Sequence, residues 1–122
     1  MPRRILDPSR IHPAIRDKLA NHHTDIVHNV QAATLSNAVL VVGMAHNPHC
    51  RRARKLLVGA GVPFHYLEYG SYLSQWRPRT ALKMWTGWPT FPMVFVKSTL
   101  VGGASELARL IESGELKRML SA

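Results

Sequence analysis

The tetrapeptide Asn47-Pro48-His49-Cys50 holds the residues whose types and spacing are best suited to chemistry, and Cys50 is the only cysteine among 122 residues. Two cysteines separated by two residues form a redox pair. The first is activated when backbone N–H groups and the helix dipole at a helix N-terminus stabilise its thiolate. Here the first position is Asn47, whose amide forms no disulfide. The segment therefore resembles a redox motif that keeps its second sulfur and lacks the first.

The neighbouring residues place this segment where a strand gives way to a helix. Residues 38–42 form an apolar run typical of a buried strand, and helical spacing begins at Pro48. Asn47 is a favourable N-cap. Pro48 suits the first helical position because an N–H group there would have no intrahelical partner.

Three stretches within residues 36–120 resemble the glutaredoxins in order and spacing. Residues 47–57 with Gly61–Phe64 resemble the Cys-Pro-Tyr-Cys helix and second strand of dithiol glutaredoxins. Residues 88–96 resemble the Trp-Pro-Thr-x-Pro segment of monothiol glutaredoxins, with Arg79 nine residues upstream as in that group. The Gly-Gly hairpin, the final helix and a monothiol-like ending are matched by residues 100–107 and 113–116.

The resemblance implies a thioredoxin-like α/β fold, with a small four-stranded mixed sheet flanked by helices. The apolar patterns agree with this order of elements. Pro78 predicts that the helix containing it starts or kinks there. The expected strands are 38–42, 64–69, 93–97 and 100–101, and the expected helices begin at Pro48 and span 73–85, 105–112 and 115–120.

Ahead of this domain, which we place at residues 36–122, residues 1–35 are predicted to form an arm and a helical extension. Residues 11–19 and 26–34 show amphipathic helical spacing. Since monothiol glutaredoxins begin with a helix beside the first strand, the second segment is expected to pack there. Residues 1–10 are expected to be a loosely ordered arm.

The resemblance also implies a glutathione groove. A cis Pro92 would direct the backbone of Phe91 toward a peptide-like ligand. Arg79 would pair with one carboxylate, or is only an exposed helix arginine. Gly103 either allows a ligand to approach the backbone closely or is needed only for the hairpin turn. Ser105 either donates hydrogen bonds from its hydroxyl and N–H to the second carboxylate or only begins a helix. The implied contact set is Arg79, Thr90, Phe91, Pro92, Gly103, Ala104 and Ser105.

Two departures from the family pattern bear on activity. Asn47 occupies the nucleophile position, which leaves Cys50 in the resolving position. Met44 replaces a lysine, and Ala104-Ser105 replaces a Cys-Asp pair. The site keeps its scaffold and loses a sulfur and two charges. Restoring Cys at 47 is therefore expected to recover part of the activity, and Lys at 44 to add to it.

The role of Cys50 has three interpretations. It is either an inert, inward-facing hydrophobe, or a reactive thiol that takes glutathione as a mixed disulfide under the influence of Arg51 and His49. In the third interpretation it joins His46 and His49 as a ligand of zinc or iron. Three ligands so close in sequence rarely converge, so we predict no metal site. Lacking a cysteine at the cap, the chain is also expected to form no [2Fe–2S] cluster.

The formal charge of +9 raises the question of nucleic-acid binding. Much of this charge falls on two predicted helices. Either its field surrounds the redox cleft and steers anionic glutathione, or the basic residues form only a solvated face. We predict no nucleic-acid partner. A single cysteine favours a reducing cytoplasm, and no stretch has the pattern of a membrane span or signal peptide. The basic residues concerned are Arg51, Arg52, Arg54, Lys55, Arg77, Arg79 and Lys83.

These observations favour a glutaredoxin-like protein with a glutathione-binding groove and weak or lost thiol–disulfide oxidoreductase activity. Two alternatives stay open. One is an active monothiol oxidoreductase or redox sensor that uses Cys50, which would need an exposed and acidic thiol. The other is a non-catalytic module that binds a protein partner.

Overall fold

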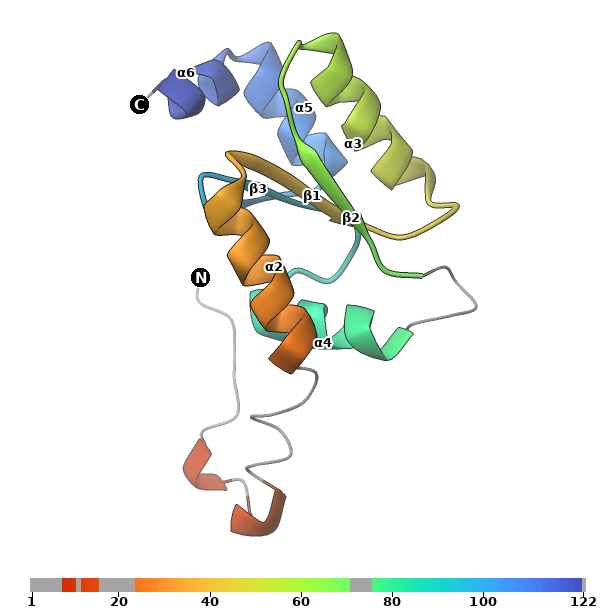
Figure 1. Ribbon diagram of the computed structural model, residues 1–122, viewed down its shortest axis with the longest axis vertical. Helices are drawn as coiled ribbons and strands as arrows, with labels where there is room; N and C mark the ends of the chain where they lie inside the picture. Colours follow the sequence, from red (N-terminus) through yellow and green to blue (C-terminus); the bar gives the residue numbers. More distant parts are fainter. Residues whose placement is uncertain (1–7, 11, 16–23, 71–75, 122) are drawn as a thin grey trace.

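The computed structural model describes residues 8–10, 12–15, 24–70 and 76–121. Its centre is a four-stranded sheet in the order β2-β1-β3-β4 (Figure 1). β1 pairs in parallel with β2 and antiparallel with β3, and β3 pairs antiparallel with β4. The strands are β1 (Val39–Gly43), β2 (His65–Glu68), β3 (Met93–Val96) and β4 (Thr99–Gly102).

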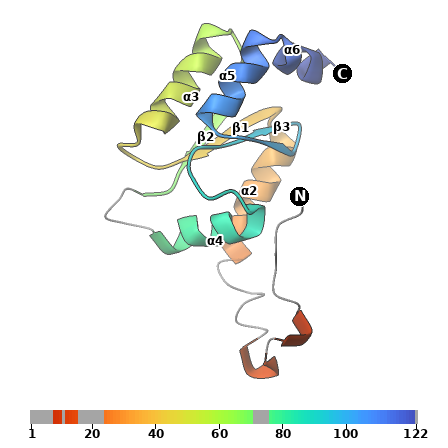
Figure 2. The ribbon, with the colours of Figure 1, turned by 180° about the vertical axis from the view of Figure 1, so that it is seen from behind.

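Helices cover both faces of this sheet, as Figures 1 and 2 show. α3 (Pro48–Gly59), α5 (Ala104–Glu112) and α6 (Glu115–Ser121) lie on one face. α2 (Thr24–Ser36) and α4 (Trp76–Thr86) lie on the other, and a short 3-10 helix, η1, spans Pro8–Arg10. The predicted four-stranded mixed sheet flanked by helices is therefore confirmed.

The alternating side chains of β1 explain why both faces are covered. Val39 and Val41 belong to the core cluster beneath α3 and α5, while Leu40 and Val42 belong to the cluster on the opposite face. All four are at most 1% exposed. A strand buried on both sides is a continuous apolar run, which is the pattern that residues 38–42 display.

Several predicted boundaries were wrong by one or two residues. β2 begins at His65 rather than Phe64, and α5 begins at Ala104 rather than Ser105. α4 begins at Trp76, two residues before Pro78, because proline is tolerated in a first turn whose N–H groups have no intrahelical acceptor. The predicted helical residues 73–75 lie outside the described part of the chain.

The predicted helix at residues 26–34 is confirmed as α2. Its Val30 is 1% exposed within the core cluster on that face, so α2 is part of the packed structure. Residues 13–15 form a helical turn. Residues 1–7, 11 and 16–19 lie outside the described residues. The loosely ordered arm and the domain boundary at residue 36 stay predictions.

Gly59, the last residue of α3, offers a simple test of this geometry. A Cβ atom added there meets nothing within 4 Å, and no left-handed φ is needed. We expect Gly59→Ala to raise the free energy of unfolding by about 0.4–1 kcal/mol, mainly because alanine restricts the unfolded chain. Gly61→Ala should lower it, because Gly61 has a φ of 69°. Urea unfolding of both variants measures the two signs.

Candidate functional site

Asn47 caps the N-terminus of α3 through its side chain. Its Oδ1 accepts hydrogen bonds from the backbone N–H groups of His49, at 2.8 Å, and Cys50, at 3.1 Å. The predicted N-cap and first-turn proline are thus confirmed. A neutral amide oxygen occupies the position where the sequence pattern would have placed an activated sulfur.

Cys50 faces the interior and is 0% exposed. It packs in the cluster that contains Met44, Phe91 and Met93. Burial raises the pKa of the Cys50 thiol, and the backbone of Met44 and the charge of Arg54 offset part of this rise. The predicted inward orientation is confirmed, and a neutral thiol in this position is a poor nucleophile.

We expect native Cys50 to react with iodoacetamide at neutral pH at least about a hundredfold more slowly than a free thiol, since reaction requires local opening. The denatured chain should react at the rate of a free thiol. Mass spectrometry of timed samples measures both rates. Equal rates in the native and denatured protein would contradict this expectation.

Three side chains gather around the Cys50 sulfur at the edge of the sheet. The Tyr66 hydroxyl donates a hydrogen bond to Oε1 of Glu68 at 3.1 Å, and the Arg54 guanidinium lies 4.3 Å from the centre of the Tyr66 ring. Burial, with smaller effects from Cys50 and Glu68, raises the pKa of Tyr66. Tyr66 therefore stays protonated at neutral pH.

Gly43 makes this close packing possible. A Cβ atom on Gly43 would lie 2.8 Å from the Tyr66 hydroxyl oxygen and 2.9 Å from the Cys50 sulfur. Gly43→Ala should therefore lower the free energy of unfolding by about 1–3 kcal/mol, because overpacking displaces both side chains. Gly59→Ala is the matched control with the opposite expected sign. Thermal or urea unfolding distinguishes them.

The segment before β3 contains the predicted cis peptide bond, between Phe91 and Pro92. Thr90 is exposed, whereas Phe91 and Pro92 are buried. Lys83 of α4 places its ammonium nitrogen 5.8 Å from the centre of the Phe91 ring. A positive charge therefore stands beside this segment.

The start of α5 lies against the same segment. A Cβ atom on Gly103 would be 3.4 Å from the Pro92 carbonyl oxygen and 3.7 Å from Nε1 of Trp88. Trp88 Nε1 is buried and has no hydrogen-bond acceptor among the described residues. The structure thus brings together the cis-proline segment, Gly103 and a buried indole N–H without a described hydrogen-bond acceptor.

The two glycines before α5 have different roles. Gly102, the last residue of β4, has a φ of 116°, so the passage from β4 into α5 requires glycine there. The predicted hairpin turn at these glycines was wrong, because Lys97 and Ser98 form the turn between β3 and β4.

Gly103 is the N-cap of α5, and its N–H donates to Oε1 of Glu106 at 2.9 Å. Ala104 is buried and Ser105 is exposed in the first turn. Ser105 is therefore a first-turn residue and not the cap.

Arg79 is not the exposed helix arginine that the sequence allowed as an alternative. It is 7% exposed, and its Nη1 donates to the carbonyl oxygen of Tyr69 at 2.9 Å. The guanidinium thus holds the backbone that follows β2. Lys83 lies one turn further along α4 and on the same face.

The interpretation of Cys50, His46 and His49 as metal ligands gains no support from the described residues. No group of three or more His, Cys, Asp or Glu side chains there is placed to hold a metal ion. Cys50 faces the core while His46 and His49 are exposed, so these three side chains do not converge on one point. In the same parts of the chain, no helix has the length and apolar character needed to cross a membrane.

Sequence reasoning missed the surroundings of the sulfur and the role of Glu106. Arg54 lies one helical turn after Cys50, and Tyr66 and Glu68 lie on the same side of a strand. This spacing is a weak signal that each pair lies close together. The contact between helix and strand depends on the fold. Glu106 at the third position of α5 is a capping-box signal that was available from the sequence.

Comparison with known proteins agrees with this fold. The glutaredoxin family model matches residues 39–101. A glutaredoxin-like protein of Dictyostelium discoideum is 45% identical over 102 residues, which are 84% of this chain and 83% of that protein. Monothiol glutaredoxin-4 of Schizosaccharomyces pombe is 36% identical over 98 residues, covering 75% of this chain and 39% of that longer protein.

Among solved structures, the crystal structure of a buckwheat glutaredoxin–glutathione complex is similar, with a TM-score of 0.73 and 25% identity. The match covers 83% of this chain and 92% of that one. The four-stranded mixed sheet flanked by helices agrees with these matches. This chain belongs to the glutaredoxin family.

Proposed function

We propose that this glutaredoxin-family protein binds glutathione in a groove and has weak or lost thiol–disulfide oxidoreductase activity. The groove lies between the N-terminus of α3, the cis-proline segment and the start of α5. One observation carries the proposal: an amide caps α3, and the single cysteine of the chain is fully buried. The proposed contact residues are Arg79, Thr90, Phe91, Pro92, Gly103, Ala104 and Ser105.

The electrostatics of the groove favour an anionic peptide. The N-termini of α3 and α5 both carry positive dipole ends, and Lys83 stands beside Phe91. Glutathione has two carboxylates and a net negative charge. The buckwheat relative forms a complex with glutathione, which supports the same ligand class here.

The unsatisfied indole N–H of Trp88 fits such a ligand. A buried donor without an acceptor costs about 1–3 kcal/mol, and a peptide carbonyl or carboxylate near Gly103 would remove that cost. Ser105 adds an exposed hydroxyl at the start of α5. These residues would bind and orient glutathione, while the missing thiol at position 47 would limit reduction of a disulfide.

Two measurements test the proposal separately. In a glutathione-coupled reduction assay with a small disulfide, the wild-type protein should turn over far more slowly than an ordinary glutaredoxin. In an NMR titration with glutathione, the amide signals of Phe91 and Ser105 should shift. Turnover at ordinary glutaredoxin rates contradicts the loss of activity, and unshifted signals contradict the groove.

We also propose that the protein forms no stable [2Fe–2S] cluster, since cluster irons prefer cysteine thiolates and Asn47 supplies none. Iron–sulfur reconstitution followed by desalting should leave no visible chromophore. A chromophore that survives desalting and is lost in Cys50→Ser would overturn this. The single, buried thiol is consistent with a reducing compartment, and we propose the cytoplasm, with no nucleic-acid partner.

A further inference from the structure

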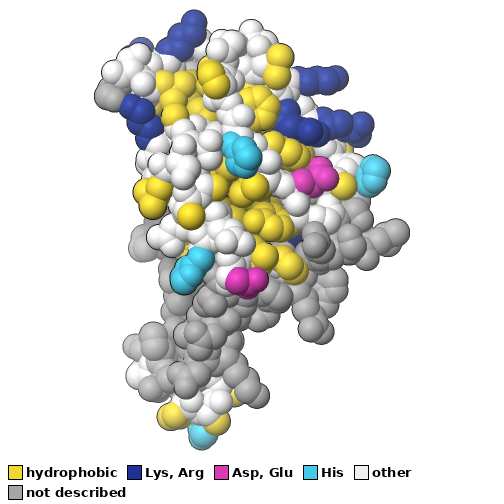
Figure 3. All heavy atoms as spheres, viewed as in Figure 1, with side chains coloured by type: hydrophobic (Ala, Val, Ile, Leu, Met, Phe, Trp, Pro, Cys, Tyr) yellow, Lys and Arg dark blue, Asp and Glu magenta, His cyan; other side chains and the backbone are white. Residues whose placement is uncertain are grey.

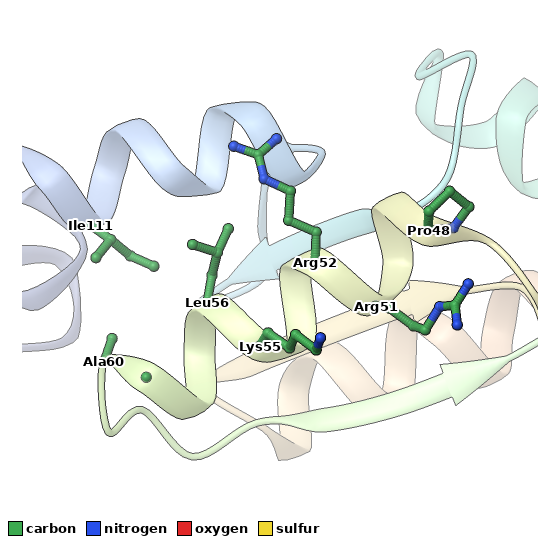
Figure 4. A pocket seen from close by; sticks show the side chains of 8 residues that line it. Pro48, Arg51, Arg52, Lys55, Leu56, Ala60 and Ile111 are labelled. Atoms are coloured by element: carbon green, nitrogen blue, oxygen red, sulfur yellow. The ribbon is translucent and has the colours of Figure 1, made fainter.

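A hollow between α3 and α5, away from the cis-proline segment, has features that the proposed function does not use. We call it the α3 hollow. It has a volume of about 680 Å³. In Figure 4, Arg52 and Leu56 extend from α3 toward α5, and Ile111 extends from α5 toward α3. The lining consists of Pro48, Arg51, Arg52, Lys55, Leu56, Gly59, Ala60 and Ile111.

The lining of the α3 hollow combines apolar and basic side chains, and helical spacing places both kinds on one side of α3. Pro48, Arg52 and Leu56 follow one another at intervals of four and so share one face of α3, and Ala60, the C-cap of the helix, continues this spacing. The floor is apolar, with Leu56 and Ile111 packed against the core cluster beneath α3 and α5. The α3 hollow thus offers aliphatic contact surface within reach of a cationic rim.

The rim is basic and uncompensated within the hollow. Arg51, Arg52 and Lys55 are exposed, and the described lining contains no carboxylate. Figure 3 shows Lys and Arg side chains gathered over α3, at the upper right of the molecule. Arg51 and Lys55 also line a second hollow on the other side of α3, of about 570 Å³. Positive charge therefore lies between two apolar depressions.

The mixed chemistry favours a protein segment over a nucleic acid. Single-stranded nucleic acids bind by stacking their bases on aromatic side chains, and the α3 hollow has no aromatic lining residue. An aliphatic floor instead accommodates a leucine or similar side chain. Flanking carboxylates would pair with the rim, and complementary charge fixes orientation and speeds association.

We propose that the α3 hollow is a docking site for an acidic segment of a partner protein that inserts an aliphatic side chain between α3 and α5. The aliphatic group contacts Leu56 and Ile111, and neighbouring carboxylates pair with Arg52 and Lys55. Because Pro48 directly follows Asn47, a docked partner is held next to the N-terminus of α3. The proposal does not depend on glutathione binding.

The test uses a fluorescein-labelled peptide, Glu-Glu-Leu-Leu-Glu-Glu, and fluorescence anisotropy with the whole 122-residue chain at low salt. We expect saturable binding that weakens with salt. Replacing all Glu with Gln, or both Leu with Ser, should weaken binding about tenfold or more. Absence of saturable binding, or equal binding of the three peptides, overturns the proposal.

Variants locate the binding. Arg52→Glu combined with Lys55→Glu should weaken peptide binding about tenfold or more. Lys117→Glu with Arg118→Glu on α6 makes the same change in net charge outside the hollow and should leave the Kd within about twofold. Gly59→Phe, at a site where an added Cβ meets nothing within 4 Å, should block the hollow while circular dichroism stays native.

Two further outcomes would also overturn the proposal. One is an equal loss of binding in the α3 and α6 charge variants, which would show that only net charge matters. The other is binding to phosphatidylserine vesicles or an oligouridylate that depends on Arg52 and Lys55, with no binding of the acidic peptide. The second result would assign the basic face to another kind of anion.

Discussion

Asn47→Cys is expected to raise glutathione-dependent disulfide reduction about a hundredfold or more above the wild-type rate. Loss of a catalytic nucleophile costs on the order of 10⁴–10⁶ in rate, so restoring one should recover a substantial part. A thiolate at this position would accept hydrogen bonds from the backbone N–H groups of His49 and Cys50, which now donate to Asn47 Oδ1. The helix dipole and the exposed basic residues of α3 would further lower the pKa of the new thiol.

The gain should be partial, because residue Asn47 is only 7% exposed and a thiol there has limited access. Asn47→Ser is the matched control, since its hydroxyl can cap α3 without supplying a sulfur. It should stay at the wild-type rate. If folded Asn47→Cys has a thiol that can be alkylated yet shows no gain, the groove does not bind glutathione. The non-catalytic interaction module would then replace the proposed function.

Met44→Lys is expected to lower the free energy of unfolding by about 3 kcal/mol at neutral pH. From the sequence alone, this substitution was expected to support a restored thiol. The structure changes that expectation, because Met44 is 7% exposed and packs with Val42, Cys50 and Phe91. An ammonium group at this place loses hydration without a described carboxylate in its cluster.

The instability should depend on pH. Burial lowers the pKa of the introduced lysine in the folded protein, whereas in the unfolded chain it stays near its usual value of about 10.4. Between the lowered folded-state pKa and about 10.4 the unfolded state binds one proton more than the folded state, so the stability of the variant relative to wild type rises with pH across this range. Urea unfolding at about pH 7 and about pH 9, compared with wild type, measures this slope.

Met44→Leu is the control for packing, since a swap of similar volume should cost less than about 1.5 kcal/mol and add no pH dependence. A Met44→Lys variant as stable as wild type, with the same pH profile, would show that its ammonium reaches water. The original expectation of a supporting lysine would then hold. A second measurement, reduction activity of the Met44→Lys/Asn47→Cys variant, would detect such support directly.

Local chemistry explains which parts of the structure could be predicted from the sequence. The buried strand β1 follows from a continuous apolar run, and the start of α3 follows from Asn47 and Pro48. The cis bond at Pro92 was predicted from the resemblance of the residues around it to the glutaredoxin family. In each case the residues that decide the structure are adjacent in the chain.

Tertiary contacts decide the rest, and the sequence carried little signal for them. The hydrogen bond from Arg79 to the Tyr69 carbonyl joins residues ten positions apart, across a segment that is only partly described. Likewise, Met44 at the end of a strand gives no sign of whether its side chain faces the core. The α3 hollow is formed jointly by α3 and α5, whose shared face depends on packing.

The short outer strands of the sheet have a consequence for self-association. β2 and β4 form the two edges, and each has four residues. Exposed, long and flat edge strands recruit further strands and lead to aggregation. On β2 the exposed residues are His65 and Glu68, and Arg54 lies over the Tyr66 ring between them. The short length of both edge strands and the charge of Glu68 thus discourage strand addition, so concentrated solutions of this protein should resist growth into fibrils.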